Sequence, residues 1–171
     1  RKFHAVAVAS GGSTAADFAV AYPDRLFSLT VSSNTFGIRS GAIAKAAQSI
    51  RPKNWDDIPS EVQEVGPSYR AVNPEGLKLW IELEHKAWVG SVRGQGRREM
   101  TEAKLEQLKV PTLLIAGAGD LLTPPSISRM LQAKIPNSEL VVAPESGHSV
   151  YWEQPEVFNK AVLDFIGRNG K

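Results

Sequence analysis

The chain has 171 residues, of which 42% are hydrophobic and 22% charged, a balance typical of a globular domain with a sizeable core. Its formal net charge of +2 is too small to favour nucleic acid or an anionic membrane as a partner. The absence of cysteine excludes disulfides and thiolate metal sites, and no apolar run approaches the roughly 20 residues of a membrane-spanning helix. We therefore expect a soluble protein, with the cytoplasm as its default location.

The first elements form a strand–helix–strand unit. Val6 and Val8 lie in a short apolar run, and residues 26–33 (LFSLTVSS) form a second run rich in β-formers. Between them, residues 13–22 repeat apolar side chains at helical spacing, with Ala15, Phe18, Ala19 and Tyr22 predicted to share one face. So short a strand–helix–strand unit predicts a parallel crossover.

The same alternation returns near the end of the chain. Residues 110–120 (VPTLLIAGAGD) predict a strand with a Gly-rich loop, and residues 124–135 predict a helix with Pro in its first turn. Residues 138–148 (SELVVAPESGH) predict a second strand and loop, and residues 155–166 a closing helix. We expect both blocks to contribute to one mostly parallel sheet with flanking helices, an α/β fold.

The middle of the chain lacks a convincing strand. Helices are predicted over residues 75–90 and 97–108, the first with Leu77, Trp80, Ile81, Glu84 and Trp88 in one stripe. We therefore divide the chain into core residues 1–35, a helical cap insertion at 36–108, and core residues 109–171.

The segment HAVAVASGGST has the pattern of a sharp turn that carries a nucleophile between a strand and a helix. With Ala9 as the apex, small residues Ala7 and Gly11 stand two positions before and after it, as a strained turn requires. Ser10 is the alternative apex because it carries a hydroxyl. That register places β-branched Val8 where the turn needs a small residue, so Ala9 is favoured.

These residues and the FAVAYPDR segment that follows resemble the nucleophile elbow of the α/β-hydrolase family. The resemblance implies an α/β-hydrolase fold with a helical cap and puts the nucleophile position at Ala9. It also implies the triad acid at Asp120, in LLIAGAGDLLTPP, and the base at His148, in PESGHSVYWEQP. The backbone N–H of Ser10 would then form half of the oxyanion hole.

Each of these residues, taken singly, also has a purely structural explanation. Asp120 could cap a helix and His148 could be a loop histidine that bonds backbone. Trp80 is a candidate substrate contact together with Phe36 and Val150, although packing is the favoured explanation for a helical tryptophan. Arginines at 93, 97 and 98 could be solvated or could clamp a substrate carboxylate.

Cofactor and metal motifs are missing from the sequence. The three histidines are scattered, no His-Glu-x-x-His occurs, and the Gly-rich turns do not match a dinucleotide-binding or P-loop pattern. In agreement with this, the resemblance to the α/β-hydrolase family implies a hydrolase without a cofactor or metal, acting on a small-molecule ester, lactone, thioester or amide. Peroxidase or dioxygenase activity without a cofactor stays open. An aspartate nucleophile is excluded at positions 9 and 10, and Ser149 stands where carbon–carbon bond hydrolases of similar core usually carry Trp.

Two features are absent relative to the family. Alanine at position 9 removes the attacking atom, so the chain is either an inactive Ser-to-Ala form of a serine hydrolase or a relative that binds a ligand without turnover. The strands that precede the elbow strand in the family are also missing. We expect an N-terminal portion of the same precursor, as a separate chain or segment, to complete the sheet.

The substrate pocket is expected to be mainly apolar.

Overall fold

The computed structural model describes residues 1–87 and 99–170. Its centre is a parallel sheet whose strands follow chain order, β1–β2–β3–β4. The strands are β1 (Phe3–Val8), β2 (Leu26–Ser32), β3 (Thr112–Gly117) and β4 (Ser138–Ala143). Every pair is parallel, so all four carboxyl ends meet at one edge of the sheet.

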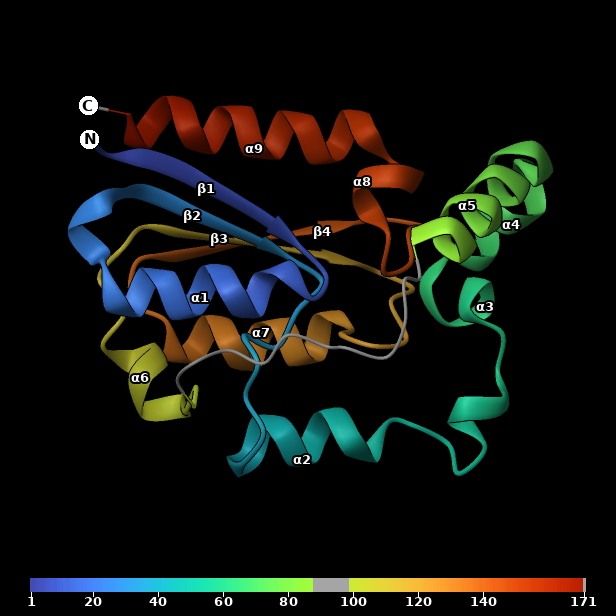
Figure 1. Ribbon diagram of the computed structural model, residues 1–171, viewed down its shortest axis with the longest axis horizontal. Helices are drawn as coiled ribbons and strands as arrows, with labels where there is room; N and C mark the ends of the chain where they lie inside the picture. The colour runs from blue at the N-terminus through green and yellow to red at the C-terminus, as the bar shows by residue number, and fades with distance from the viewer. Residues whose placement is uncertain (88–98, 171) are drawn as a thin grey trace.

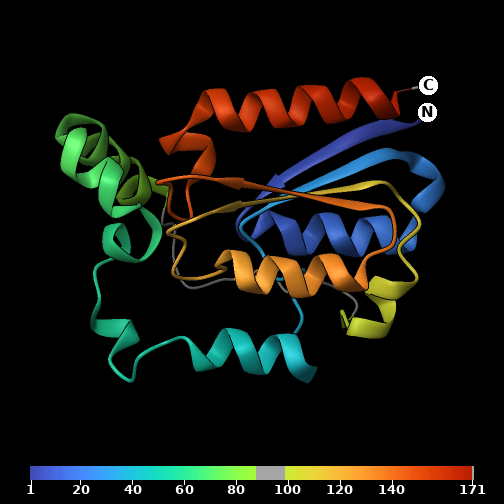
Figure 2. The same cartoon turned by 180° about the vertical axis from the view of Figure 1, so that it is seen from behind.

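Helices cover both faces of this sheet. Helix α9 (Pro155–Asn169) lies on one face, and helices α1 (Gly11–Ala21) and α7 (Pro125–Lys134) lie on the other, in both views (Figures 1 and 2). The central strand β3 is buried along its whole length, as expected for a parallel strand covered on two sides. The predicted α/β class with a mostly parallel sheet and flanking helices is confirmed.

Side chains of β2 alternate between two layers. Leu29 and Val31 belong to the apolar cluster that includes residues of α1 and α7, while Ser28, Thr30 and Ser32 alternate with them and are fully buried. The Ser28 hydroxyl lies 2.8 Å from Nδ1 of His4 on β1. The second face of β2 is therefore unusually polar, although the first has the expected apolar packing.

The buried stripe of helix α1 overlaps the predicted one at Ala19, and Ala15 and Phe18 of the predicted face are half-buried against the same core. Gly12, Ala16 and Ala19 are buried, whereas Tyr22 is 53% exposed. Small residues let the helix axis approach the sheet closely, and the aromatic residues are displaced to the flank. There the centre of the Phe18 ring lies 5.6 Å from that of Phe3.

The chain between β2 and β3 forms helices outside the sheet. They are α2 (Gly41–Ser49), α3 (Ser60–Glu64), α4 (Pro67–Val72), α5 (Pro74–Ala87) and α6 (Glu102–Glu106), with a 3-10 turn at Trp55–Asp57 between α2 and α3. Another 3-10 turn, Pro23–Arg25, lies earlier, just before β2. Helices α3 to α5 lie beyond the carboxyl ends of the strands (Figure 1). A parallel bridge joins Ile38 and Met100. The cap boundaries at 36 and 108 stay a prediction.

The described part of the first predicted cap helix agrees with helix α5: Trp80 is buried, and Leu77, Ile81 and Glu84 of the predicted stripe are half-buried. Leu83, outside that stripe, is 45% exposed. The second predicted cap helix differs from the structure. Helix α6 has only five residues, and the start of its predicted range, like Trp88, lies outside the described residues. Within residues 1–87 and 99–170, no helix is both long and apolar enough to cross a membrane. Strand β1 stands at an edge of the described sheet, and the expected N-terminal partner stays a prediction.

Candidate active site

Ala9 occupies a sharp, strained turn between β1 and α1. Its φ of +46° lies in the left-handed region, which a residue with a Cβ rarely adopts. Two hydrogen bonds maintain this conformation: the Ala9 N–H donates to the Ser32 carbonyl at 3.0 Å, and the Ala9 carbonyl accepts from the Gly12 N–H at 3.0 Å. The turn therefore lies at the carboxyl end of the sheet, where open α/β folds bind ligands.

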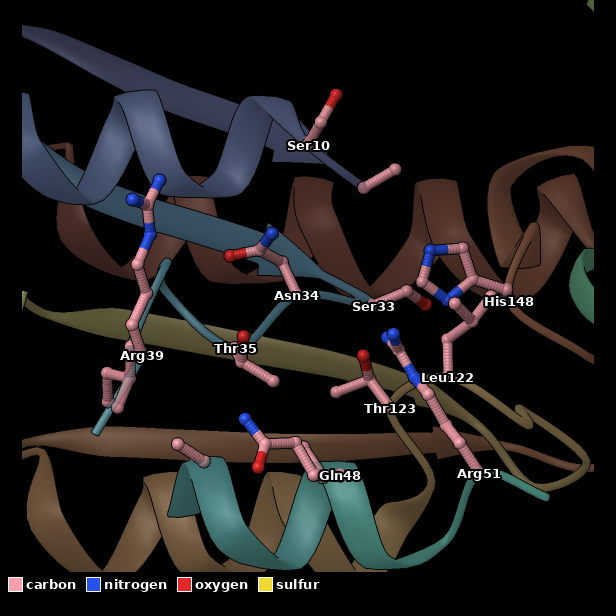
Figure 3. Close-up of a pocket in the computed structure, with 14 residues that line it drawn as sticks. Ser10, Ser33, Asn34, Thr35, Arg39, Gln48, Arg51, Leu122, Thr123 and His148 are labelled. Carbon is pink, nitrogen blue, oxygen red and sulfur yellow. The ribbon is translucent and has the colours of Figure 1, made fainter. Parts of the chain in front are cut away.

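Ser10 has ordinary backbone geometry. Its φ of −57° and ψ of −27° are helical, and it immediately precedes α1. The side-chain hydroxyl points away from His148 (Figure 3). The strain thus belongs to Ala9, which favours Ala9 over Ser10 as the apex of the turn.

Glycine at position 12 is required by a close approach to β2. A Cβ on Gly12 would lie 2.7 Å from the Asn34 side chain and 2.8 Å from that of Val31. A Cβ on Gly11 would meet only Ala7, at 3.9 Å, among the described residues. The tightest steric restriction in this turn therefore falls one residue later than the small-residue pattern suggests.

Asp120 lies in the loop after β3 and is only 2% exposed. Its Oδ1 accepts the backbone N–H groups of Leu122 at 2.8 Å and Thr123 at 2.9 Å. These bonds fix the carboxylate by its own loop, and they compensate part of the cost of burial.

His148 lies in the loop after β4 and completes a buried pair with Asp120. Its Nδ1 is 3.0 Å from each carboxylate oxygen of Asp120. Burial alone would lower the pKa of His148, but the hydrogen bond to Asp120 and the negative charges of Asp120, Glu64 and Glu153 together raise that pKa above its ordinary value of 6.5. The second ring nitrogen is left for another partner.

A cavity of about 590 Å³ joins these parts, because Ala9, Ser10 and His148 all line it. The rest of its wall comes largely from β2's carboxyl end and α2 (Figure 3). Most of these additional residues are polar: Ser33, Asn34, Thr35, Arg39, Gln48, Arg51 and Thr123. The expectation of a mainly apolar pocket is therefore wrong.

The three predicted substrate contacts are buried away from this cavity wall. Phe36 is 1% exposed within the apolar cluster under α1, and its N–H donates to the Asn34 side chain at 2.6 Å. Val150 is fully buried against the α9 face. Trp80 is 6% exposed, and its indole N–H donates to the Ser149 hydroxyl at 3.3 Å. Each side chain packs in the interior, so the packing interpretation applies to all three.

Sequence reasoning missed the wall formed by residues 33–51. One signal was present: the polar run Ser33–Asn34–Thr35 directly follows a buried parallel strand, the position where α/β proteins place binding residues. The arginines at 93, 97 and 98, the alternative anion clamp, lie outside the described residues.

Comparison with known proteins agrees with this geometry. A family model described as alpha/beta hydrolase fold matches residues 67–155, more than half of the chain. The chain belongs to the α/β-hydrolase fold family. In this family, a 2-hydroxy-6-oxononadienedioate/2-hydroxy-6-oxononatrienedioate hydrolase from Burkholderia vietnamiensis is 26% identical over 192 residues, covering 96% of this chain and 62% of the relative.

Solved α/β-hydrolase structures show the same fold. A thermophilic esterase from Thermogutta terrifontis matches with a TM-score of 0.79 and 23% identity, over 99% of this chain and 66% of the esterase. Naproxen esterase from Bacillus subtilis matches with a TM-score of 0.68 and 21% identity, over 96% of this chain and 60% of the esterase. The chain thus spans less than two thirds of the length of these relatives.

Proposed function

We propose that the protein with serine in place of Ala9 is a serine hydrolase of the acyl-enzyme type, and that the alanine makes the present chain inactive. One observation carries this proposal: the strained turn at Ala9 shares a cavity with His148, whose other side is bonded to Asp120. A buried acid–imidazole pair beside a strained elbow is the arrangement that nucleophilic acyl transfer needs.

Each group has a defined role in the proposed reaction. A serine hydroxyl at position 9 attacks the substrate carbonyl, and the free nitrogen of His148 takes its proton and gives it to the leaving group as the scissile bond breaks. Water then attacks the acyl-enzyme with the same nitrogen as base, which releases the acid and regenerates the serine. Asp120 keeps the Nδ1 proton facing itself and stabilises the imidazolium. The Ser10 backbone N–H contributes a hydrogen bond to the developing oxyanion. None of these steps uses a metal or cofactor.

The charge of the cavity wall specifies the substrate class further. Arg39 and Arg51 both line the cavity, and none of the described lining residues is acidic. Arg51 is oriented by stacking, with its guanidinium carbon 5.5 Å from the centre of the Trp55 ring. Guanidinium groups bind carboxylates well. We therefore propose an ester that carries a carboxylate away from the scissile bond; the substrates named for the Burkholderia relative are likewise dioates.

A non-catalytic binding protein is the second candidate, and it is favoured by the alanine itself. In that case the cavity binds an anionic small molecule and Asp120 and His148 have no proton to transfer. The buried Asp120–His148 pair supports the enzyme instead, because ligand binding alone does not need a buried carboxylate and imidazole where an apolar contact would serve.

Reversal of the alanine separates the two candidates. The full-length protein with Ala9→Ser is assayed for nitrophenolate release from 4-nitrophenyl acetate and mono-4-nitrophenyl succinate, with Ala9→Ser/His148→Gln as the control. We expect a rate gain on the order of 10³-fold or more over the Ala9 protein, lost in the control. A folded Ala9→Ser protein without gain on either ester supports the binding protein.

A further inference from the structure

Glu153 is a buried carboxylate that the proposed reaction does not use. It ends the short helix α8 (Val150–Glu153) and is 8% exposed. Its partners are backbone amides: Oε2 accepts the N–H of Gly66 at 2.9 Å, and both oxygens accept the N–H of Gly147, at 3.0 and 2.9 Å. A carboxylate buried at this cost calls for a role that explains its partners.

The two amides belong to segments far apart in sequence. Gly147 directly precedes His148, and Gly66 lies between α3 and α4, in the predicted cap. A second set of bonds joins the same segments: the Glu64 carbonyl accepts the N–H groups of His148 at 2.8 Å and Ser149 at 3.1 Å. The main chain around His148 is therefore tied to residues 64–66 on two sides.

Steric contact leaves this junction little freedom. A Cβ on Gly66 would lie 2.6 Å from the Gly147 nitrogen and 2.7 Å from Oε2 of Glu153. The carbonyl of Ser146, on the other side of Gly147, accepts the Gly119 N–H at 2.7 Å, which connects the histidine loop to the Asp120 loop as well. A shift of the Glu153 carboxylate is thus transmitted to the backbone on which His148 stands.

We infer that Glu153 is a positioning residue, whose carboxylate fixes the His148 loop against residues 64–66 and thereby keeps the imidazole between Asp120 and position 9. Its kinetic consequence rests on the proposed hydrolase function, whereas its effect on the histidine loop does not. Glu153 is also one of the charges that raise the pKa of His148.

The first test needs no catalysis and uses the full-length protein with Ala9. Glu153→Gln removes the charge and one acceptor oxygen, and Glu156→Gln makes the same chemical change on an exposed residue in the first turn of α9. NMR titration follows the His148 ring protons, and hydrogen exchange follows the amides of Gly66, Gly147 and His148. We expect Glu153→Gln to lower the pKa of His148 and to speed exchange at least tenfold at these amides, with Glu156→Gln unchanged. Unchanged values in a folded Glu153→Gln protein overturn the inference.

The second test measures turnover in the Ala9→Ser background. Glu153→Gln is expected to lower kcat about tenfold while KM stays within twofold, because the cavity wall that binds substrate is not touched. Glu153→Asp keeps the charge on a shorter side chain, and its kcat is expected to lie between those of the proteins with glutamate and with glutamine at position 153. Equal kcat values in all three proteins contradict positioning and leave the hydrolase proposal standing.

An inactive Ala9→Ser protein contradicts the hydrolase proposal. The NMR and exchange measurements then test the positioning role of Glu153 without any activity data. If Glu153→Gln does not fold, the same titration and exchange measurements on Glu153→Asp decide it. If Glu153→Asp speeds exchange, relative to the Ala9 protein, more at the Gly147 and His148 amides than at the amides of α7, the inference is supported. An equal change in both regions opposes it.

Discussion

The Nδ1 atom of His148 lies 3.0 Å from both carboxylate oxygens of Asp120, and both side chains are buried. The carboxylate is in turn bonded by the amides of Leu122 and Thr123, so the ring is oriented by a group that is itself fixed. This chain of bonds crosses from the loop after β3 to the loop after β4. It brings together two residues that are 28 positions apart in the sequence.

The pH dependence of turnover follows from the raised pKa of His148. Burial opposes the charge, but Asp120, Glu64 and Glu153 outweigh it, so the imidazole keeps its proton to a higher pH than a free histidine. A general base must be neutral. We expect kcat/KM of the Ala9→Ser protein to rise with pH through an ionisation above 6.5, the ordinary value, and pH–rate profiles measure it. An acid limb centred below that value contradicts the charge balance.

The same pKa shift predicts how His148 affects stability. Because the folded-state pKa is raised, the contribution is fully present below about pH 6.5 and is lost as pH rises through the folded-state pKa. The free energy of unfolding of the Ala9 protein should therefore exceed that of His148→Gln by more at low pH than at high pH. Urea denaturation across this range measures the difference. A gap that grows with pH has the wrong sign.

Replacement of Asp120 should lower activity by removing the group that orients His148. In the Ala9→Ser background, Asp120→Asn keeps the size of the side chain but favours the wrong imidazole tautomer, so kcat is expected to fall on the order of 10⁴-fold, as in the serine-protease example. In the Ala9 protein, the same change should lower the pKa of His148, which NMR titration measures. A His148 pKa that stays raised in Asp120→Asn would show that other groups supply the shift.

The sequence predicts the parts of this site that depend on local pattern. Short buried strands and the small residues around Ala9 are visible as periodicity and composition, and the loops with Asp120 and His148 follow strands whose carboxyl ends must meet. The strained φ of Ala9 agrees with the predicted turn. Local pattern thus suffices where one strand end determines the position of a residue.

Residues whose positions depend on tertiary packing are not predictable in this way. Phe36 resembles a pocket residue because it follows a strand, yet its φ of +59° accompanies a backbone turn, and the ring packs in the core. Arg51 lies in what reads as a charged link, yet the end of α2 brings it to the cavity. Neither outcome is encoded in a period or a motif, since both depend on how the chain returns across the sheet.

Arg51 gives a direct test of the proposed substrate charge. In the Ala9→Ser background, Arg51→Gln should lower kcat/KM for mono-4-nitrophenyl succinate about tenfold, the value of one charged hydrogen bond, and leave 4-nitrophenyl acetate within twofold. Lys45→Gln removes one charge from an exposed position on α2, the helix that ends just before Arg51, and is the control. Equal losses on both esters, or an equal effect of Lys45→Gln, contradict a carboxylate contact at Arg51.

Glycine substitutions test the steric account of the turn. Gly12→Ala places a methyl group 2.7 Å from Asn34, in the loop after β2, and 2.8 Å from Val31, near the end of β2 that supports Ala9. We expect a loss of about 1–3 kcal/mol in the free energy of unfolding, as for overpacked cores. Gly167 is the matched control, because it lies in α9 and a Cβ there meets nothing within 4 Å. Gly167→Ala should raise the free energy of unfolding by about 0.4–1 kcal/mol, because alanine restricts the unfolded chain and favours helix. Urea titration of both variants compares the two sites directly.

A Gly12→Ala protein as stable as Gly167→Ala would mean that the neighbouring side chains move to accommodate the added methyl group. Glycine at position 12 would then not be required by packing.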